Sequence, residues 1–305
     1  MTFKFNRVVL ALALAAAGSA NAALDTMAGG NSSLAFVAYD RTGTAVGSFM
    51  ADLGFNLYSF TPTNAPTDTI VWNFNTSTIT IGSGPATSTG IDYSPFTNFF
   101  STVQTSELRW AVIAGDSVNQ RFLTTGAPTA TQLADTGTSR QTNQVTANMV
   151  GADTLYLFNN SANATSTHGT AATGASFAQA SQNWYAPTSA SGFGINGNWN
   201  NALRWQAVGA GTASNNLVAS RFFLVDNTVS RGPGLDTAGI TMFGTPNVDA
   251  PNALPAFGPT VSTFLYDHES ATLTWTPAIP EPGTYALLMA GLAAVGFVAR
   301  RRRVG

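Results

Sequence analysis

Short apolar segments that alternate with turn residues dominate the middle of the chain. Residues 34–39 are apolar and aromatic, residues 40–43 (Asp-Arg-Thr-Gly) supply a turn, and residues 45–50 resume the apolar pattern. This arrangement is typical of a β-hairpin. Residues 70–74 and 78–81 predict a second strand pair with a short turn between them. Five further segments have the composition of strands: 108–114, 154–158, 202–208, 221–225 and 272–276.

Helical patterns are few. Residues 94–95 (Ser-Pro) form a good cap and first-turn pair, and an aromatic stripe at helical spacing follows them, which usually packs into a core. The stripe consists of Phe96, Phe99, Phe100 and Val103. Residues 129–150 predict a second helix, whereas residues 159–197 predict a long loop and the prolines of 246–259 predict an extended linker. The sequence therefore predicts a mainly β fold, an antiparallel β-sandwich-like domain with one or two short helices.

The N-terminus has the pattern of a secretory signal peptide. Lys4 and Arg7 precede an apolar run over residues 8–17, and Ala20 and Ala22 form a small-x-small cleavage site. The apolar run is too short to span about 30 Å of hydrocarbon. We therefore expect residues 1–22 to be a signal peptide that is removed during export.

Three features follow one another at the C-terminus. A triplet of Pro280, Glu281 and Pro282 precedes an uncharged run over residues 285–299, which as a helix spans about 22 Å. This length is marginal for a transmembrane helix, so we expect a temporary single-pass anchor. The arginines that follow place this end in the cytoplasm and residues 23–279 outside. These arginines are Arg300, Arg301, Arg302 and Arg303.

The order of triplet, apolar run and arginines resembles a PEP-CTERM sorting tail, over about 26 residues. The resemblance implies that an exosortase, a membrane-embedded thiol protease, recognises Pro280, Glu281 and Pro282. It also implies processing near this triplet and passage toward the cell surface or the exopolysaccharide matrix. A plain single-pass anchor with a proline-rich stalk is the alternative. We expect three parts: the signal peptide 1–22, an exported β-rich domain 23–276 and a sorting tail 277–305.

The composition limits the partners of the exported part. Charged residues make up 9 % of the chain, against about a quarter in ordinary soluble proteins, which predicts a surface of hydroxyl and amide groups. Between the two ends, seven arginines stand against 14 acidic residues, and there is no lysine. Nucleic acid and anionic membrane surfaces are excluded as partners of this body, because both require clustered cations. The lack of cysteine excludes disulfides and thiolate catalysis.

Candidate catalytic chemistry is sparse. Of the two histidines, His168 lies in a polar loop and His268 lies within Asp267-His268-Glu269, where a carboxylate could orient the imidazole. In a strand, however, Asp267 and Glu269 share one side and His268 faces away. This pattern favours a solvated polar strand end.

Carboxylate pairs are open alternatives for glycoside hydrolysis, because the two partners need to meet only in space. The candidate pairs are Asp92 with Glu107 and Asp226 with Asp236. Calcium is an open alternative at Asp226, Asp236 or Asp249, and no other cofactor is expected.

These observations favour a non-enzymatic, exported protein of the cell surface or the exopolysaccharide matrix that an exosortase sorts through its tail. The first alternative is a secreted carbohydrate-binding module that uses exposed aromatic side chains as sugar platforms. Its candidate platforms are Trp72, Trp184, Tyr185 and Trp199. The second alternative is a polysaccharide-active hydrolase, which requires two carboxylates about 5 to 10 Å apart in a groove.

Overall fold

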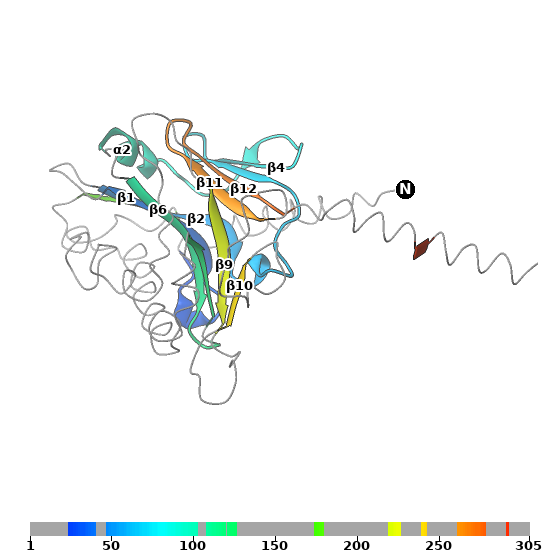
Figure 1. The fold of residues 1–305 in the computed structure, drawn as a ribbon. Helices are drawn as coiled ribbons and strands as arrows, with labels where there is room; N and C mark the ends of the chain where they lie inside the picture. The colour runs from blue at the N-terminus through cyan, green and yellow to red at the C-terminus, as the bar shows by residue number, and fades with distance from the viewer. Residues whose placement is uncertain are drawn as a thin grey trace, which may run out of the picture.

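The computed structural model of the protein describes residues 24–40, 47–102, 108–119, 121–126, 174–179, 219–226, 239–242, 261–278 and 291–292. This part of the chain is mainly β (Figure 1). The strands are β1 (Ser33–Asp40), β2 (Gly47–Asn56), β3 (Ile70–Asn73), β4 (Thr78–Ile81), β5 (Thr87–Ser88), β6 (Leu108–Asp116), β7 (Arg121–Gly126), β8 (Ala175–Gln179), β9 (Ser220–Asp226), β10 (Gly239–Met242), β11 (Thr263–Asp267) and β12 (Thr272–Thr276). The helical elements are α2 (Pro95–Thr102), η1 (Met27–Gly29) and η2 (Tyr58–Phe60).

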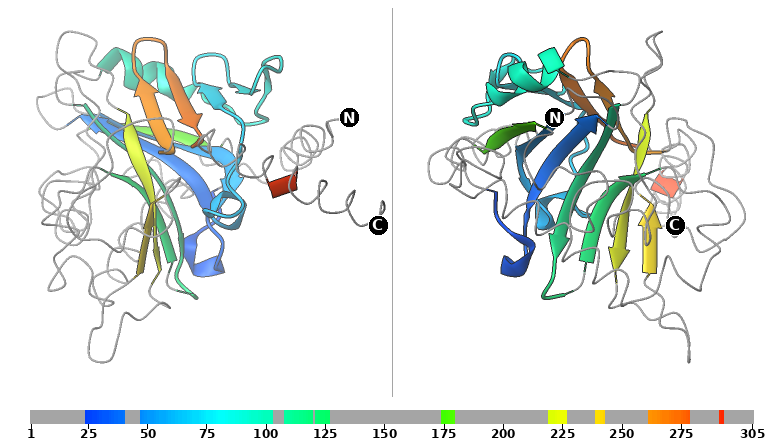
Figure 2. Two further views of the ribbon diagram at one scale, coloured as in Figure 1. Left: turned by 45° about the vertical axis from the view of Figure 1, so that its right-hand side comes forward. Right: turned by 90° about the vertical axis from the view of Figure 1, so that its left-hand side faces the viewer.

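All of these strands belong to one antiparallel sheet, with the order β5-β4-β3-β12-β11-β9-β7-β6-β1-β2-β8. The sheet branches at β9. One side of β9 pairs with β7, while the other side pairs with β11 through Ser220 and Arg221 and with β10 through residues 223–226. We call β8, β2, β1, β6, β7, β9 and β10 the major arm, and β11, β12, β3, β4 and β5 the tail arm. Figure 2 shows the orange β11–β12 hairpin leaving the plane of the major arm.

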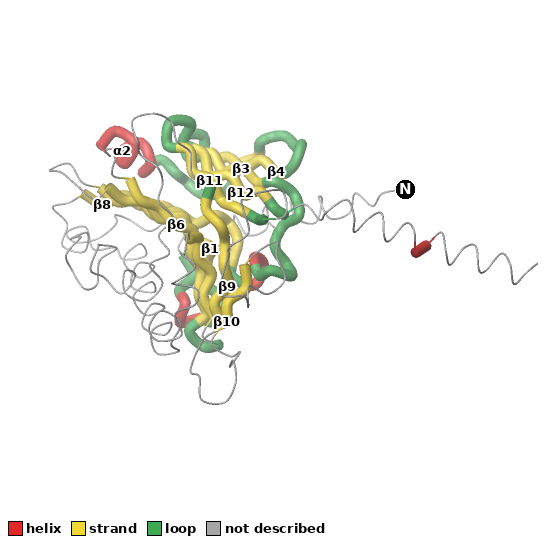
Figure 3. Tube along the Cα trace, in the orientation of Figure 1, coloured by secondary structure: helices red, strands yellow, loops and turns green. Residues whose placement is uncertain are grey.

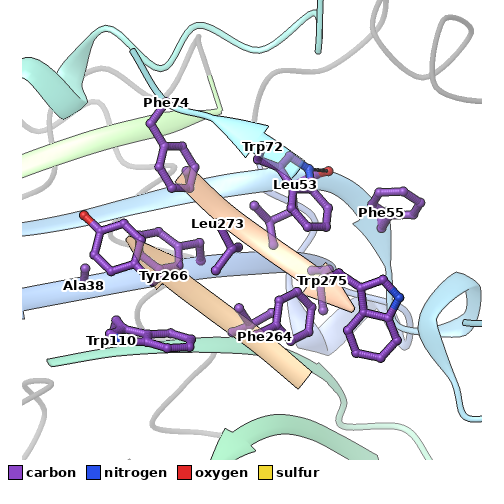
Figure 4. Close-up of a cluster of buried hydrophobic side chains, with 14 of the residues drawn as sticks. Ala38, Leu53, Phe55, Trp72, Phe74, Trp110, Phe264, Tyr266, Leu273 and Trp275 are labelled. Atoms are coloured by element: carbon purple, nitrogen blue, oxygen red, sulfur yellow. Dashed lines mark hydrogen bonds between the residues drawn. The ribbon is translucent and has the colours of Figure 1, made fainter. Parts of the chain in front are cut away.

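The expected sandwich is therefore one continuous, curled sheet and not two separate sheets. The arms nevertheless pack face to face, as the two layers of a sandwich do. The ring centroid of Phe36 on β1 lies 5.0 Å from that of Phe74, which directly follows β3, and 4.8 Å from that of Tyr266 on β11. The ring of Phe60 on η2 lies 5.0 Å from Trp275 on β12. Large aromatic side chains thus fill the space between the arms (Figure 4).

Burial differs between β1, in the major arm, and the strands of the tail arm. On β1, Leu34 and Phe36 belong to the core between the arms, and the intervening Ala35 and Val37 are buried as well. The tail arm instead alternates buried with half-buried positions along β3, β11 and β12. A continuous apolar run and an alternating run are the patterns expected for a covered strand and a half-exposed strand, respectively.

The strands that the pattern predicts within the described residues are all confirmed. Both predicted pairs, β1–β2 and β3–β4, are antiparallel, and β6, β9 and β12 occupy the predicted segments 108–114, 221–225 and 272–276. The predicted loop over residues 159–197 is wrong in one part, because β8 lies within it and pairs with β2. The strands β5, β7, β10 and β11 were not predicted. The segments 154–158, 202–208, 129–150 and 246–259 lie outside the described residues.

The first predicted helix is confirmed as α2, which begins at Pro95 as predicted but has a narrower core face. Phe96 and Phe99 are buried, but Phe100 is 41 % exposed. The Ser94 hydroxyl donates a hydrogen bond to Asp92 Oδ2 (3.0 Å), and the Ser94 backbone N–H donates to Asp92 Oδ1 (2.9 Å). Asp92 therefore orders the residue that precedes the helix.

Candidate functional site

The C-terminal tail begins at an interior strand of the tail arm. The strand that precedes the tail is β12, which pairs with β11 on one side and with β3 on the other. Beyond the strand, the Ala278 N–H donates a hydrogen bond to Ser262 Oγ (2.9 Å). The Trp275 indole Nε1–H donates to the Pro66 carbonyl oxygen (3.0 Å), which ties the end of β12 to the loop before β3. The chain is therefore fixed to the domain up to Ala278.

The end of the tail arm from which the chain leaves is poor in charge. We define this exit face as residues 61–70, 81–86, 261–263 and 276–278, which the register Trp275–Ile70–Ile81 and the Trp275–Pro66 bond bring together. Asp68 is the one ionisable residue in these ranges, and the rest are mainly Thr, Pro, Gly, Ser and Ala. Figure 3 shows the green loop before β3 on this side and α2 at the opposite end of the β11–β12 hairpin.

The residues expected to act in sorting lie almost entirely outside the described residues. This applies to Pro280, Glu281 and Pro282, to the arginines 300–303, and to the signal-peptide positions Ala20 and Ala22. Within the apolar run, Gly291 and Leu292 are described as helical, and Leu292 is 60 % exposed. Among the residues that the structure describes, no helix has the length and apolar character needed to cross a membrane.

One of the expected sugar platforms is wrong. Trp72 is fully buried between the arms, and its indole Nε1–H donates a hydrogen bond to the Leu53 carbonyl oxygen (2.9 Å). A sugar ring cannot stack on a side chain that no solvent reaches. The other three aromatic candidates, Trp184, Tyr185 and Trp199, lie outside the described residues.

Asp267 is the last residue of β11, and His268 and Glu269 lie in the turn between β11 and β12. Asp267 Oδ1 accepts hydrogen bonds from the backbone N–H groups of Glu269 (3.0 Å) and Ser270 (3.3 Å), so its carboxylate stabilises the turn. His268 lies with aromatic rings instead. Its Nδ1 is 2.7 Å from the Tyr266 hydroxyl oxygen, and its ring stacks on Phe100 at 4.7 Å. Burial lowers the pKa of His268 to about 4, so the imidazole is neutral at neutral pH.

Two buried or half-buried carboxylates were not singled out from the sequence. Asp116 is fully buried at the end of β6 and accepts hydrogen bonds from the Tyr58 hydroxyl (2.6 Å) and from Asn119 Nδ2 (2.7 Å). Burial alone would raise the pKa of Asp116, but these hydrogen bonds and those from the backbone of the turn outweigh it and lower the pKa. The spacing of Asp116 and Asn119 after an apolar strand is a turn signal that would have drawn attention to this position.

Asp52 on β2 has the opposite electrostatic environment. Its carboxylate accepts hydrogen bonds from the Gly54 N–H (2.7 Å) and the Ser33 hydroxyl (2.9 Å). Burial raises the pKa of Asp52 to about 7, and the nearby negative charge of Asp25 adds to this increase. No feature of the sequence distinguishes Asp52 from other aspartates on half-exposed strand positions.

The described residues contain no group of three or more His, Asp or Glu side chains that could hold a metal ion. Of the expected carboxylate pairs, Asp92 is exposed and bonded to Ser94, and its expected partner Glu107 lies outside the described residues. The backbone of Asp226 lies at the end of β9, whereas Asp236 and Asp249 lie outside the described residues. Neither of the two expected carboxylate pairs therefore has both side chains within the described residues.

Comparison with protein families identifies the tail. Residues 278–303 match the PEP-CTERM protein-sorting motif. The match starts at Ala278, whose backbone N–H donates the hydrogen bond to Ser262. No curated protein and no solved structure matches the chain.

Proposed function

We propose that this protein, which carries a PEP-CTERM sorting motif, is a non-enzymatic component of the cell surface or of the exopolysaccharide matrix. The motif marks an exported protein for exosortase-dependent sorting. In our proposal, the β domain is the delivered cargo, and the tail holds it temporarily in the inner membrane until the exosortase acts. The position of the motif carries this proposal: it begins at Ala278, which a hydrogen bond to Ser262 ties to the domain.

The local surroundings of three of the titratable groups support a non-enzymatic role. Asp267 holds a turn, Asp116 accepts hydrogen bonds from Tyr58 and Asn119, and His268 is neutral among aromatic rings. Each of these groups is engaged in holding the fold together. An acid or base that acts on a substrate must instead present its proton-transfer atom to that substrate.

Deletion of residues 280–305 tests the sorting part of this proposal. We expect the truncated protein to be exported but no longer delivered to the surface, and fractionation with immunodetection measures this change. Glu281→Ala in the full chain is the sharper variant, because it alters the triplet and leaves the apolar run and arginines intact. We expect this variant to accumulate uncut in the inner membrane. Unchanged surface delivery of both variants contradicts the proposal.

A further inference from the structure

We propose that the exit face of the tail arm is a contact surface for the membrane-embedded sorting enzyme. This inference rests on the proposed function, because it requires that the tail is held in the membrane and processed there. It adds a second determinant to the Pro-Glu-Pro triplet, a surface of the folded domain.

The length of chain between the domain and the membrane carries the argument. Ala278 is fixed by its hydrogen bond to Ser262, and the apolar run begins at Gly283, five residues later. Five residues reach at most about 18 Å when fully extended. The uncharged run over residues 283–299, as a helix, is about 25 Å long, which is shorter than the hydrocarbon core of about 30 Å. Gly283 therefore lies at or inside the edge of the hydrocarbon.

Little space remains for the enzyme in this arrangement. The headgroup region takes about 5 to 7 Å of the available 18 Å on this side of the bilayer, which leaves at most about 11 to 13 Å between headgroups and domain. A single α-helix with its side chains is about 10 to 12 Å wide. The triplet starts at Pro280, within about 7 Å of Ala278. An enzyme that grips the triplet must therefore touch the surface from which the tail emerges.

The chemistry of the exit face suits this position. Asp68 is its one ionisable residue, although the exported body as a whole is acidic. The acidic residues Asp267 and Glu269 of the same arm lie in the turn at the far end of the β11–β12 hairpin. Covering a charged group is costly unless it is paired, so a face with a single carboxylate is suited to contact with a membrane-embedded enzyme. The arm therefore keeps its acidic turn away from the membrane and directs a neutral surface toward it.

Bulky substitutions at exposed positions test the contact. Thr63 and Ser83 are exposed on the exit face, and Asn75 is exposed in the β3–β4 turn at the other end of the tail arm. We expect Thr63→Trp and Ser83→Trp in the full chain to slow cleavage at least threefold in cells that contain the sorting enzyme. Asn75→Trp is the matched control and is expected to be cut at the parent rate. Pulse-chase labelling measures the rates, and protease resistance of the domain confirms that each variant folds.

A longer linker between the domain and the triplet distinguishes a blocked contact from misfolding of the Trp variants. Eight Gly/Ser residues inserted between Ala278 and Ile279 add about 16 Å of average reach, which removes the need for contact. We expect the spacer to restore both Trp variants to within twofold of the parent. Cleavage of the Trp variants at the parent rate overturns the inference, as does slow cleavage that the spacer does not restore. Failure of the proposed function looks different: the unmodified chain is then equally uncut with and without the sorting enzyme.

Discussion

Three buried tryptophans in one core allow the contribution of an indole hydrogen bond to stability to be measured separately from the contribution of packing. Trp72 and Trp110 are both at most 1 % exposed. The Nε1–H of Trp72 donates to the Leu53 carbonyl oxygen at 2.9 Å, whereas the Nε1–H of Trp110 has no hydrogen-bond partner. Substitution by phenylalanine removes the donor in both cases and loses a similar volume. The two variants therefore differ mainly in what happens to the hydrogen bond.

The expected magnitudes follow from this difference. Lost contacts and residual cavity cost each variant about 1 kcal/mol. Trp72→Phe additionally removes a buried hydrogen bond from the Leu53 carbonyl, which costs about 1 to 2 kcal/mol. Trp110→Phe instead removes an unpaired buried donor, a gain of about 1 to 2 kcal/mol that offsets the cavity. We expect the first variant to lose about 2 to 3 kcal/mol and the second to stay within about 1 kcal/mol of the parent.

Urea unfolding followed by far-UV circular dichroism measures both variants, because the change in this signal on unfolding comes mainly from the backbone and persists when one tryptophan is replaced. The transition midpoint of Trp72→Phe should fall while its m-value stays constant. Trp275→Phe is a useful intermediate case, since its Nε1–H donates to the half-buried Pro66 carbonyl, which water can reach after the substitution. Equal losses in Trp72→Phe and Trp110→Phe refute the reasoning, because packing alone then decides stability.

Three further predictions concern charge and close packing. The pKa of Asp52 in the folded protein is raised from 3.8 to about 7, so the folded protein loses stability as the pH rises from about 4 to 7. Asp52→Asn should flatten this part of the pH profile and raise the melting temperature at pH 8. The full shift corresponds to about 4 kcal/mol, which solvent at this half-buried site reduces to about 1 to 2 kcal/mol. Gly115→Ala should lower stability by about 1 to 3 kcal/mol in thermal unfolding, because the new Cβ overlaps the Met27 side chain. An unchanged melting temperature contradicts this prediction and means that η1 moves aside freely. Tyr58→Phe removes the hydroxyl that donates a hydrogen bond to Asp116, whose pKa in the folded protein is lowered. The variant should therefore be less stable than the parent at neutral pH by about 1 to 2 kcal/mol. Its stability should approach that of the parent as the pH falls through the range in which Asp116 is protonated.

The strands that the sequence predicts correctly carry their signal locally. The β3–β4 pair shows a short apolar run, a turn and a second run within 12 residues. By contrast, β7 has no alternation to detect, because Phe122, Leu123 and Thr124 are consecutive and all buried. The pairing of β12 with β3 joins residues about 200 positions apart, and no local pattern encodes such a partner.

The error at Trp72 had a detectable cause. Ile70, Trp72 and Phe74 are spaced two residues apart on one strand, so they share a face. Three large apolar side chains on one face indicate the core, and all three are buried. The two-residue periodicity of side chains on a strand therefore predicts that Trp72 is buried, and this would have removed it from the candidate platforms. The sorting motif over residues 278–303, in contrast, could be predicted from the sequence, because the match to this family depends on the order of the residues and requires no knowledge of tertiary contacts.

The interior position of β12 determines how the domain bears mechanical load. A protein that is tethered through its C-terminus receives any pull from the membrane along the strand that carries the tether. Because β12 has β11 on one side and β3 on the other, such a pull runs perpendicular to two rows of hydrogen bonds and stresses them together in shear. A tether on an edge strand would be held by a single row. The tail is therefore attached where traction on it is spread over three strands.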